Sequence, residues 1–220
     1  NYYHALRRQI RRNHRKPLVL MTPKSLLRHK RAVSQLIDMG PGTSFHRILW
    51  DDAEQRPGYS VKLKADKDIR RVVLCSGKVY YDLFDEREKR GVDDVQLLRV
   101  EQLYPYPEDA VEREMLRFKH AEIVWVQEEP KNQGYWTYIA PLLEETLVKV
   151  GNARPRPPCG GFSVWGKSAI TSAFARLARS DGAPSGNANE TMPLAWAPNR
   201  HTMGARMTSI KHAHAQARRG

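Results

Sequence analysis

The alternation of short apolar segments with longer helical segments between Arg71 and Val150 constrains the fold of this chain most strongly. Three apolar segments have the length of strands, and three segments have the length and periodicity of helices. The predicted strands cover residues 71–75, 95–100 and 122–126, and the predicted helices cover residues 78–90, 108–118 and 135–150, with a kink at Pro141. Apolar strands separated by helices form βαβ units. The sequence therefore predicts an α/β fold with a mostly parallel sheet and helices on both faces.

The first third of the chain has a less regular pattern. Tyr3, Leu6 and Ile10 recur at spacings of three and four, which predicts a helix over residues 2–12. The apolar run at residues 18–21 predicts a short buried strand, and Pro23 precedes a predicted short helix at about residues 26–31. Residues 40–59 are rich in Gly, Pro and charge, and we expect them to be mostly loop.

Basic residues gather at the two ends of the chain. Residues 1–31 hold ten Lys and Arg and no acid, and residues 151–220 hold ten Lys and Arg against two acids, within a net charge of +13. We interpret both regions as solvated basic faces. The alternative is a nucleic-acid-binding module, in which the contacts would be made by Arg7, Arg8, Arg11, Arg12, Arg15 and Lys16. The sequence has no helix-turn-helix pattern or aromatic stacking motif, so we expect no nucleic-acid partner.

Cysteine and histidine spacing predicts no metal site. Cys75 and Cys159 lack the C-x-x-C spacing of zinc sites, and Cys75 lies in an apolar run, as a buried reduced thiol does. His212 and His214 have the spacing of weak metal ligands, but their surroundings predict a solvated tail. No apolar run approaches the 18 residues of a membrane span, so we expect no membrane partner.

Two turns are candidates for ligand-facing loops. Ser76, Gly77 and Lys78 lie between a predicted strand and a predicted helix, but no glycine stands five residues before Gly77, which excludes a Walker phosphate loop. Glu128 and Glu129 follow the strand at 122–126. Open α/β sheets bind ligands beyond the carboxyl ends of their strands, so Ser76, Lys78, Glu128 and Glu129 are candidates. The alternative is structural: a turn at Gly77, and carboxylates that pair with Lys or Arg or cap the next helix.

Five stretches in order resemble one family. They are YYHALRRQ from Tyr2, MTPKSLLRH from Met21, LCSGKVYYDL from Leu74, RVEQLYPYP from Arg99 and WVQEEPKNQG from Trp125. They resemble the C-terminal region of the thiamine-dependent first component of the 2-oxoglutarate dehydrogenase complex. SFHRILWDDAE from Ser44 is similar to the alphaproteobacterial and mitochondrial forms. The resemblance covers about residues 1–156 and ends near Pro157.

The resemblance implies a domain organisation and a function. Residues 1–21 would end a pyrimidine-binding domain with its last helix, residues 22–156 would form a transketolase C-terminal-like domain, and residues 157–220 would be a divergent basic tail, largely disordered. The family decarboxylates 2-oxoglutarate on thiamine diphosphate, held by magnesium, and passes the succinyl group to the lipoyl-bearing succinyltransferase component. It forms homodimers, in the bacterial cytoplasm or the mitochondrial matrix.

The family's cofactor and catalytic residues lie upstream of the region matching Tyr2. We therefore expect this chain to be a C-terminal fragment that has no catalytic residue, binds no cofactor or metal, and is inactive alone. Its role would be dimer contact and regulation. No separate enzyme activity is expected from it.

One ligand role also follows from the resemblance. Actinobacterial relatives bind acetyl-CoA at an effector site, and the matching positions Arg8 and Gln102 are retained here. Other positions depart from that site, because Asp109 and Ala110 replace an arginine pair. Losing two cations weakens the binding of a polyanion. A third interpretation, a stand-alone effector-binding module, requires Arg8 and Gln102 to line a pocket.

Overall fold

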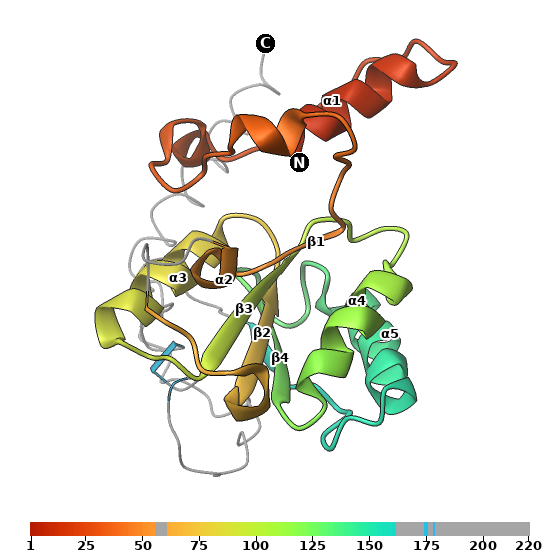
Figure 1. Ribbon diagram of the computed structural model, residues 1–220. Coiled ribbons are helices and arrows are strands. Elements are labelled where there is room, and N and C mark those ends of the chain that lie inside the picture. The colour runs from red at the N-terminus through yellow and green to blue at the C-terminus, as the bar shows by residue number, and fades with distance from the viewer. Residues whose placement is uncertain (56–60, 162–173, 176–177, 179–220) are drawn as a thin grey trace, which may run out of the picture. The chain divides into compact units, whose positions relative to one another are not determined.

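Five strands form one mixed sheet at the centre of the chain. The computed structural model describes residues 1–55, 61–161, 174–175 and 178 (Figure 1). The strands lie in the order β1-β3-β2-β4-β5, and β1 is antiparallel to β3 while the other pairs are parallel. They are β1 (Ile48–Leu49), β2 (Arg71–Cys75), β3 (Val95–Val100), β4 (Glu122–Gln127) and β5 (Cys159–Gly161). The predicted α/β class with a mostly parallel sheet is confirmed.

Helices connect the strands where the sequence predicts them. The described α-helices are α1 (Tyr2–Arg11), α2 (Asp52–Gln55), α3 (Val79–Arg90), α4 (Glu108–Met115) and α5 (Trp136–Lys149). Short 3₁₀ turns are η1 (Lys24–Arg28), η2 (Leu36–Met39), η3 (Asp66–Asp68) and η4 (Leu116–Phe118). The helix predicted at 108–118 therefore ends as an α-helix at Met115 and tightens into η4. Gly91 terminates α3 in the left-handed conformation, with φ +62°, as glycine commonly does.

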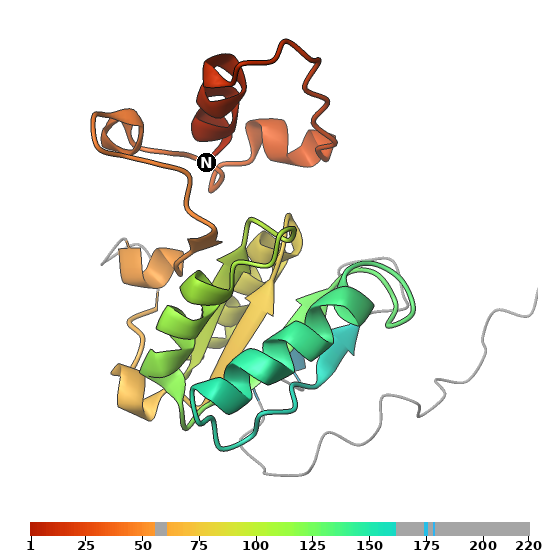
Figure 2. The same cartoon turned by 90° about the vertical axis from the view of Figure 1, so that its right-hand side faces the viewer.

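The two faces of the sheet are covered by different helices. Val72 and Leu74 point to the face packed by α4 and α5, and Val73 and Cys75 point to the face packed by α3. Figures 1 and 2 show α4 and α5 together on one side of the strands and α3 on the other. Each central strand is buried on both sides, which explains its uninterrupted apolar sequence. The prediction of helices on both faces is confirmed.

The strand order reverses about β2. The chain moves from β2 through α3 to β3 on one side, and then through α4 to β4 on the other side of β2. The carboxyl ends of β2 and β4 therefore flank a topological switch point, the place where open α/β sheets most often bind ligands.

The strand predicted at residues 18–21 is absent from the structure. This segment has no regular structure, and Val19 and Met21 are 77% and 93% exposed. An apolar run becomes a buried strand only when a neighbouring strand pairs with it, and no described strand lies in register with this segment. The helix predicted at about 26–31 forms instead as the 3₁₀ turn η1.

Described residues beyond Pro157 add to the sheet and its core. β5 pairs in parallel with β4, so that Cys159 lies opposite Trp125. Phe174 is helical and fully buried among the residues that pack on α3, and the carbonyl oxygen of Ala178 accepts a hydrogen bond from Arg70 (3.3 Å). The predicted disorder of residues 157–220 falls mostly outside the described residues, as do His212 and His214.

Candidate functional site

The structure brings two of the predicted ligand-facing residues together at the switch point. Lys78 stands just before α3 and Glu128 just after β4, and their side chains form a half-exposed ion pair. Gly77, with φ +69°, makes the strand-to-helix turn. Both positions therefore have the structural role that was the alternative to ligand binding. Gly77 makes a turn, and Glu128 pairs with Lys78. Ser76 is partly buried beside them, and the ligand role of the group stays a prediction.

A buried glutamine holds the loop that carries Glu128. The Oε1 atom of Gln127 accepts hydrogen bonds from the indole N–H of Trp125 (3.0 Å) and the backbone N–H of Trp136 (3.1 Å). Its Nε2 atom donates to backbone carbonyls of Glu129 (3.2 Å), Pro130 (3.2 Å) and Gln133 (2.7 Å). One side chain therefore fixes both ends of the loop. Glu129 itself is exposed, and its carbonyl group is part of this network.

The two residues predicted for an effector site both contact the segment that precedes β1. The guanidinium of Arg8, exposed on α1, stacks over the ring of Phe45 at 5.7 Å. The backbone N–H of Gln102 donates to the carbonyl of Arg47 (3.2 Å), and its side chain donates to the carbonyl of Pro105 (2.9 Å). Neither residue lines the cavity described next, and their role as effector contacts stays a prediction.

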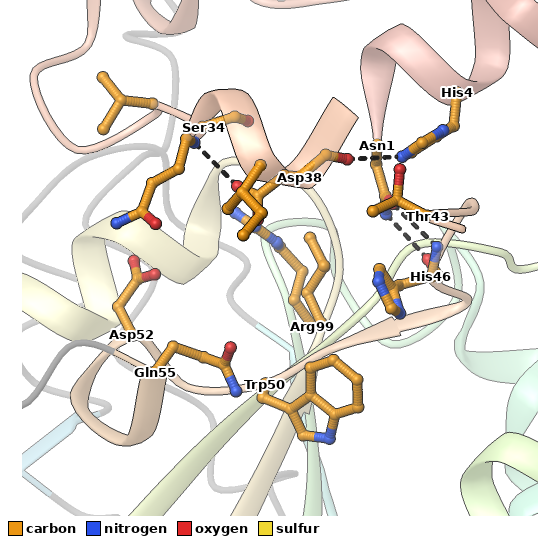
Figure 3. Close-up of a pocket in the computed structure, with 14 residues that line it drawn as sticks. Asn1, His4, Ser34, Asp38, Thr43, His46, Trp50, Asp52, Gln55 and Arg99 are labelled. Carbon is orange, nitrogen blue, oxygen red and sulfur yellow. Dashed lines mark hydrogen bonds between the residues drawn. The ribbon is translucent and has the colours of Figure 1, made fainter. Parts of the chain in front are cut away.

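A cavity of about 340 Å³ opens where α1 and the segment before β1 meet the carboxyl end of β3 (Figure 3). Its wall combines polar and apolar side chains from four separate stretches of chain. The lining residues are Asn1, His4, Val33, Ser34, Gln35, Ile37, Asp38, Thr43, His46, Leu49, Trp50, Asp52, Gln55 and Arg99. This site was not predictable from the sequence, because its residues lie up to about one hundred positions apart.

The polar face of α1 forms one wall of the cavity. The side chain of Asn1 accepts a hydrogen bond from the backbone N–H of His46 (2.9 Å) and donates to its carbonyl (2.8 Å). His4 is only 5% exposed, and its Nε2 atom lies 2.9 Å from the carbonyl oxygen of Asp38, to which it donates. Arg7 donates to the carbonyl of Thr43 (2.7 Å). These contacts attach the helix to the segment that precedes β1.

Arg99 supplies the cation of the cavity. Its guanidinium stacks on the rings of Tyr80 (4.6 Å) and Tyr81 (5.3 Å), and its Nε atom lies 2.9 Å from a carboxylate oxygen of Glu101. Burial by itself lowers the pKa of Arg99, but Glu101 and the tyrosines outweigh it, so the pKa is raised. The guanidinium therefore remains charged at every physiological pH.

A fully buried ion pair positions the opposite wall. Arg87 and Asp51 are both completely shielded from solvent and form a two-pronged contact, with Nη2 to Oδ1 at 2.8 Å. The backbone N–H of Leu97 also donates to Asp51 (2.8 Å). The next residue, Asp52, donates its backbone N–H to the hydroxyl of Tyr80 (2.9 Å). These contacts tie the start of α2 to the sheet and to α3.

Comparison with known proteins decides the family. A family model described as 2-oxoglutarate dehydrogenase C-terminal matches residues 33–170. The chain belongs to the 2-oxoglutarate dehydrogenase C-terminal family. The 2-oxoglutarate dehydrogenase E1 components of Brucella ovis and Brucella anthropi are each 63% identical to it over 150 residues, which is 68% of this chain. The resemblance drawn from the five stretches is confirmed.

The comparisons also set the limits of the match. The chain spans about 15% of the length of these curated relatives. The family match extends to residue 170, past Pro157, where the motif resemblance ends. The strand β5 lies in this extension, which is consistent with its pairing to β4.

The part of the chain that the structure describes offers no cluster of metal-ligating side chains. Within that part, no group of three or more His, Cys, Asp or Glu side chains is arranged to hold a metal ion. The E1 family uses thiamine diphosphate, and no step of that chemistry is assigned to the described residues. No helix in this part of the chain is long and apolar enough to cross a membrane.

Proposed function

We propose that this chain acts as the C-terminal domain of a 2-oxoglutarate dehydrogenase first component. Such a component decarboxylates 2-oxoglutarate oxidatively and transfers the succinyl group to lipoyl groups in the tricarboxylic acid cycle. The observation that carries the proposal is the 63% identity to Brucella E1 components over 150 residues. At this identity, the doubly covered sheet is expected to be shared with those relatives.

The surface of the first 37 residues supports a role in assembly. Large apolar side chains are exposed on α1, on η1 and the irregular segments around it, and on η2. They are Tyr2, Tyr3, Leu6, Ile10, Leu18, Val19, Leu20, Met21, Leu27, Val33, Leu36 and Ile37. Exposed apolar surface of this extent is characteristic of protein–protein contact. We propose that this chain contributes to dimer contact and regulation and has no decarboxylase activity alone.

Cofactors and partners follow from the same proposal. Thiamine diphosphate and magnesium are bound by parts of the enzyme outside the residues described here. The subunit pairs with a second copy and delivers the succinyl group to the succinyltransferase component. We propose that the enzyme acts in the cytoplasm of a bacterium or in the mitochondrial matrix of a eukaryote.

Mixing the chain with the rest of a relative tests the proposal. The purified chain is added to the Brucella ovis enzyme from which the matching C-terminal region has been removed. Ferricyanide reduction is then measured with 2-oxoglutarate, thiamine diphosphate and magnesium. We expect activity from the mixture and none from either part alone. A folded chain that neither binds the truncated enzyme nor restores activity would contradict the proposal.

Salt-dependent DNA binding is the outcome that would favour the nucleic-acid alternative. The structure already engages two of its candidate residues, because Arg7 donates to Thr43 and Arg8 stacks on Phe45. We therefore expect no shift of duplex DNA by the chain at physiological salt, as measured by gel retardation.

A further inference from the structure

The cavity of Figure 3 presents charges of both signs. Among the described residues that line it, Arg99 is the only lysine or arginine, and Asp38 and Asp52 are the acids. Figure 3 shows Arg99 near the centre, with Asp52 and Gln55 on one side and residues of α1 on the other. The contact between Arg99 and Glu101 is made at Nε. A guanidinium has five N–H donors, so the contact with Glu101 and the side-chain hydrogen bond with Tyr81 leave others available to a ligand.

A buried histidine in the wall has an unused ring nitrogen. His4 is 5% exposed, and its Nε2 atom is occupied by the carbonyl of Asp38. Its Nδ1 atom is buried and has no hydrogen-bond partner among the described residues. Buried polar atoms in native proteins almost always have a partner, whether protein, water or ligand. The imidazole of His4 is therefore fixed in the wall through Nε2, and its buried Nδ1 atom is left unsatisfied.

The size and the apolar part of the wall suit a small organic molecule. A volume of about 340 Å³ lies at the lower end of the range of ligand sites and corresponds to about a dozen waters. Leu49, Ile37 and the ring of Trp50 provide the apolar surface. The indole N–H of Trp50 already donates to Glu114 (2.9 Å), so the indole contributes no free donor.

The charged walls are also held in place before any ligand arrives. Arg99 is stacked on two tyrosines, and Asp52 follows the buried Asp51 and donates its backbone N–H to Tyr80. Groups fixed in advance lose little entropy when a ligand binds. A ligand that carried only negative charge would be repelled by Asp38 and Asp52, and one that carried only positive charge would be repelled by Arg99.

We propose that this cavity binds a small zwitterion of the α-amino-acid class. The ligand carboxylate lies against Arg99, and the ligand ammonium group lies against Asp52. The inference does not rest on the proposed function, and the cavity is separate from the positions of Arg8 and Gln102.

Calorimetric titration of the full 220-residue chain tests the inference. Each of the twenty protein amino acids is titrated, and 2-oxoglutarate is titrated as a control. It has the carbon skeleton and the two carboxylates of L-glutamate, but a ketone in place of the ammonium group. We expect at least one amino acid to bind, and L-glutamate to bind at least about tenfold more tightly than 2-oxoglutarate. Binding of no amino acid, or equal or tighter binding of 2-oxoglutarate, would overturn the inference.

Matched variants locate the binding. In Asp52→Asn the shape of the side chain and the backbone contact to Tyr80 are retained, so we expect folding to be unchanged by circular dichroism. Amino-acid affinity should fall about tenfold or more, while 2-oxoglutarate affinity should not fall. The control is Asp109→Asn, an exposed acid on α4 outside the cavity, which should bind as the unmodified chain does. Unchanged amino-acid binding in Asp52→Asn would contradict the assignment.

Discussion

Replacing Arg87 by methionine probes the best-defined electrostatic contact in the structure. Both Arg87 and Asp51 are fully shielded from solvent, and the guanidinium bonds both carboxylate oxygens. Burial lowers the pKa of Arg87, but the hydrogen bonds and the charge of Asp51 outweigh it and raise that pKa, so the guanidinium stays protonated. Methionine has a similar length and no charge. The variant therefore leaves Asp51 in the core with the backbone N–H groups of Leu97 and Ala53 as its remaining donors.

We expect Arg87→Met to lower the free energy of unfolding by a large amount for a single core substitution. Breaking a buried ion pair by removing one partner destabilises proteins by about 3–5 kcal/mol, because a charge stays buried without compensation. The hydrogen bonds from Leu97 and Ala53 to Asp51 are retained, so we expect the lower part of this range, about 3 kcal/mol. The double variant Arg87→Met with Asp51→Leu removes both charges, and replacing both partners by apolar groups is often close to neutral. We therefore expect the double variant to be more stable than the single one.

Urea unfolding followed by far-ultraviolet circular dichroism measures both effects. The control is Lys64→Met, which removes the exposed pair of Lys64 with Asp93. Exposed pairs of this kind contribute about 1 kcal/mol or less. A loss of less than about 1 kcal/mol in Arg87→Met, or a double variant less stable than the single one, would refute the reasoning.

Three further outcomes are expected. Gly77→Ala should destabilise by about 1–2 kcal/mol in urea unfolding, since φ is +69° and its new Cβ would meet no atom within 4 Å, leaving backbone strain as the only cost. Gln127→Leu should cost at least about 2 kcal/mol, because the N–H groups of Trp125 and Trp136 lose their acceptor, and protease should then cleave the 128–134 loop faster. Burial raises the pKa of the Cys75 thiol from 9.0 to about 12. As pH rises, the unfolded chain therefore loses this proton at a lower pH than the folded chain does. The free energy of unfolding should then fall as pH rises from 9 towards 12. Cys75→Ala should flatten that fall, and an unchanged pH profile would contradict this cause.

The central βαβ region was predictable because its signals are local. The strand Arg71–Cys75 is apolar throughout and is followed by Gly77, and Gly91 marks the end of α3. The same kind of signal failed at residues 18–21, where an apolar run remains exposed. Four residues carry no information on whether another strand will pair with them. Whether such a segment becomes a strand therefore depends on the rest of the fold.

The cavity and the buried ion pair were not predictable for the same reason. Asp51 and Arg87 are thirty-six positions apart, and a charged residue in sequence carries no sign that it will be buried. His4 and Arg99 line the same cavity only because the fold brings α1 close to the carboxyl end of β3. The pairing of Glu128 with Lys78 was anticipated as one of two alternatives, because the parallel sheet places both strand ends at one edge.

A chimeric enzyme tests the central claim most directly. The 150-residue region of the Brucella ovis E1 component that matches this chain is replaced by the corresponding residues of this chain, and kcat and KM for 2-oxoglutarate are measured with the thiamine cofactor present. If this domain is equivalent to that of the relatives, the chimera should be dimeric and retain kcat within about tenfold. A chimera that is folded and dimeric but has no decarboxylase activity would contradict the account.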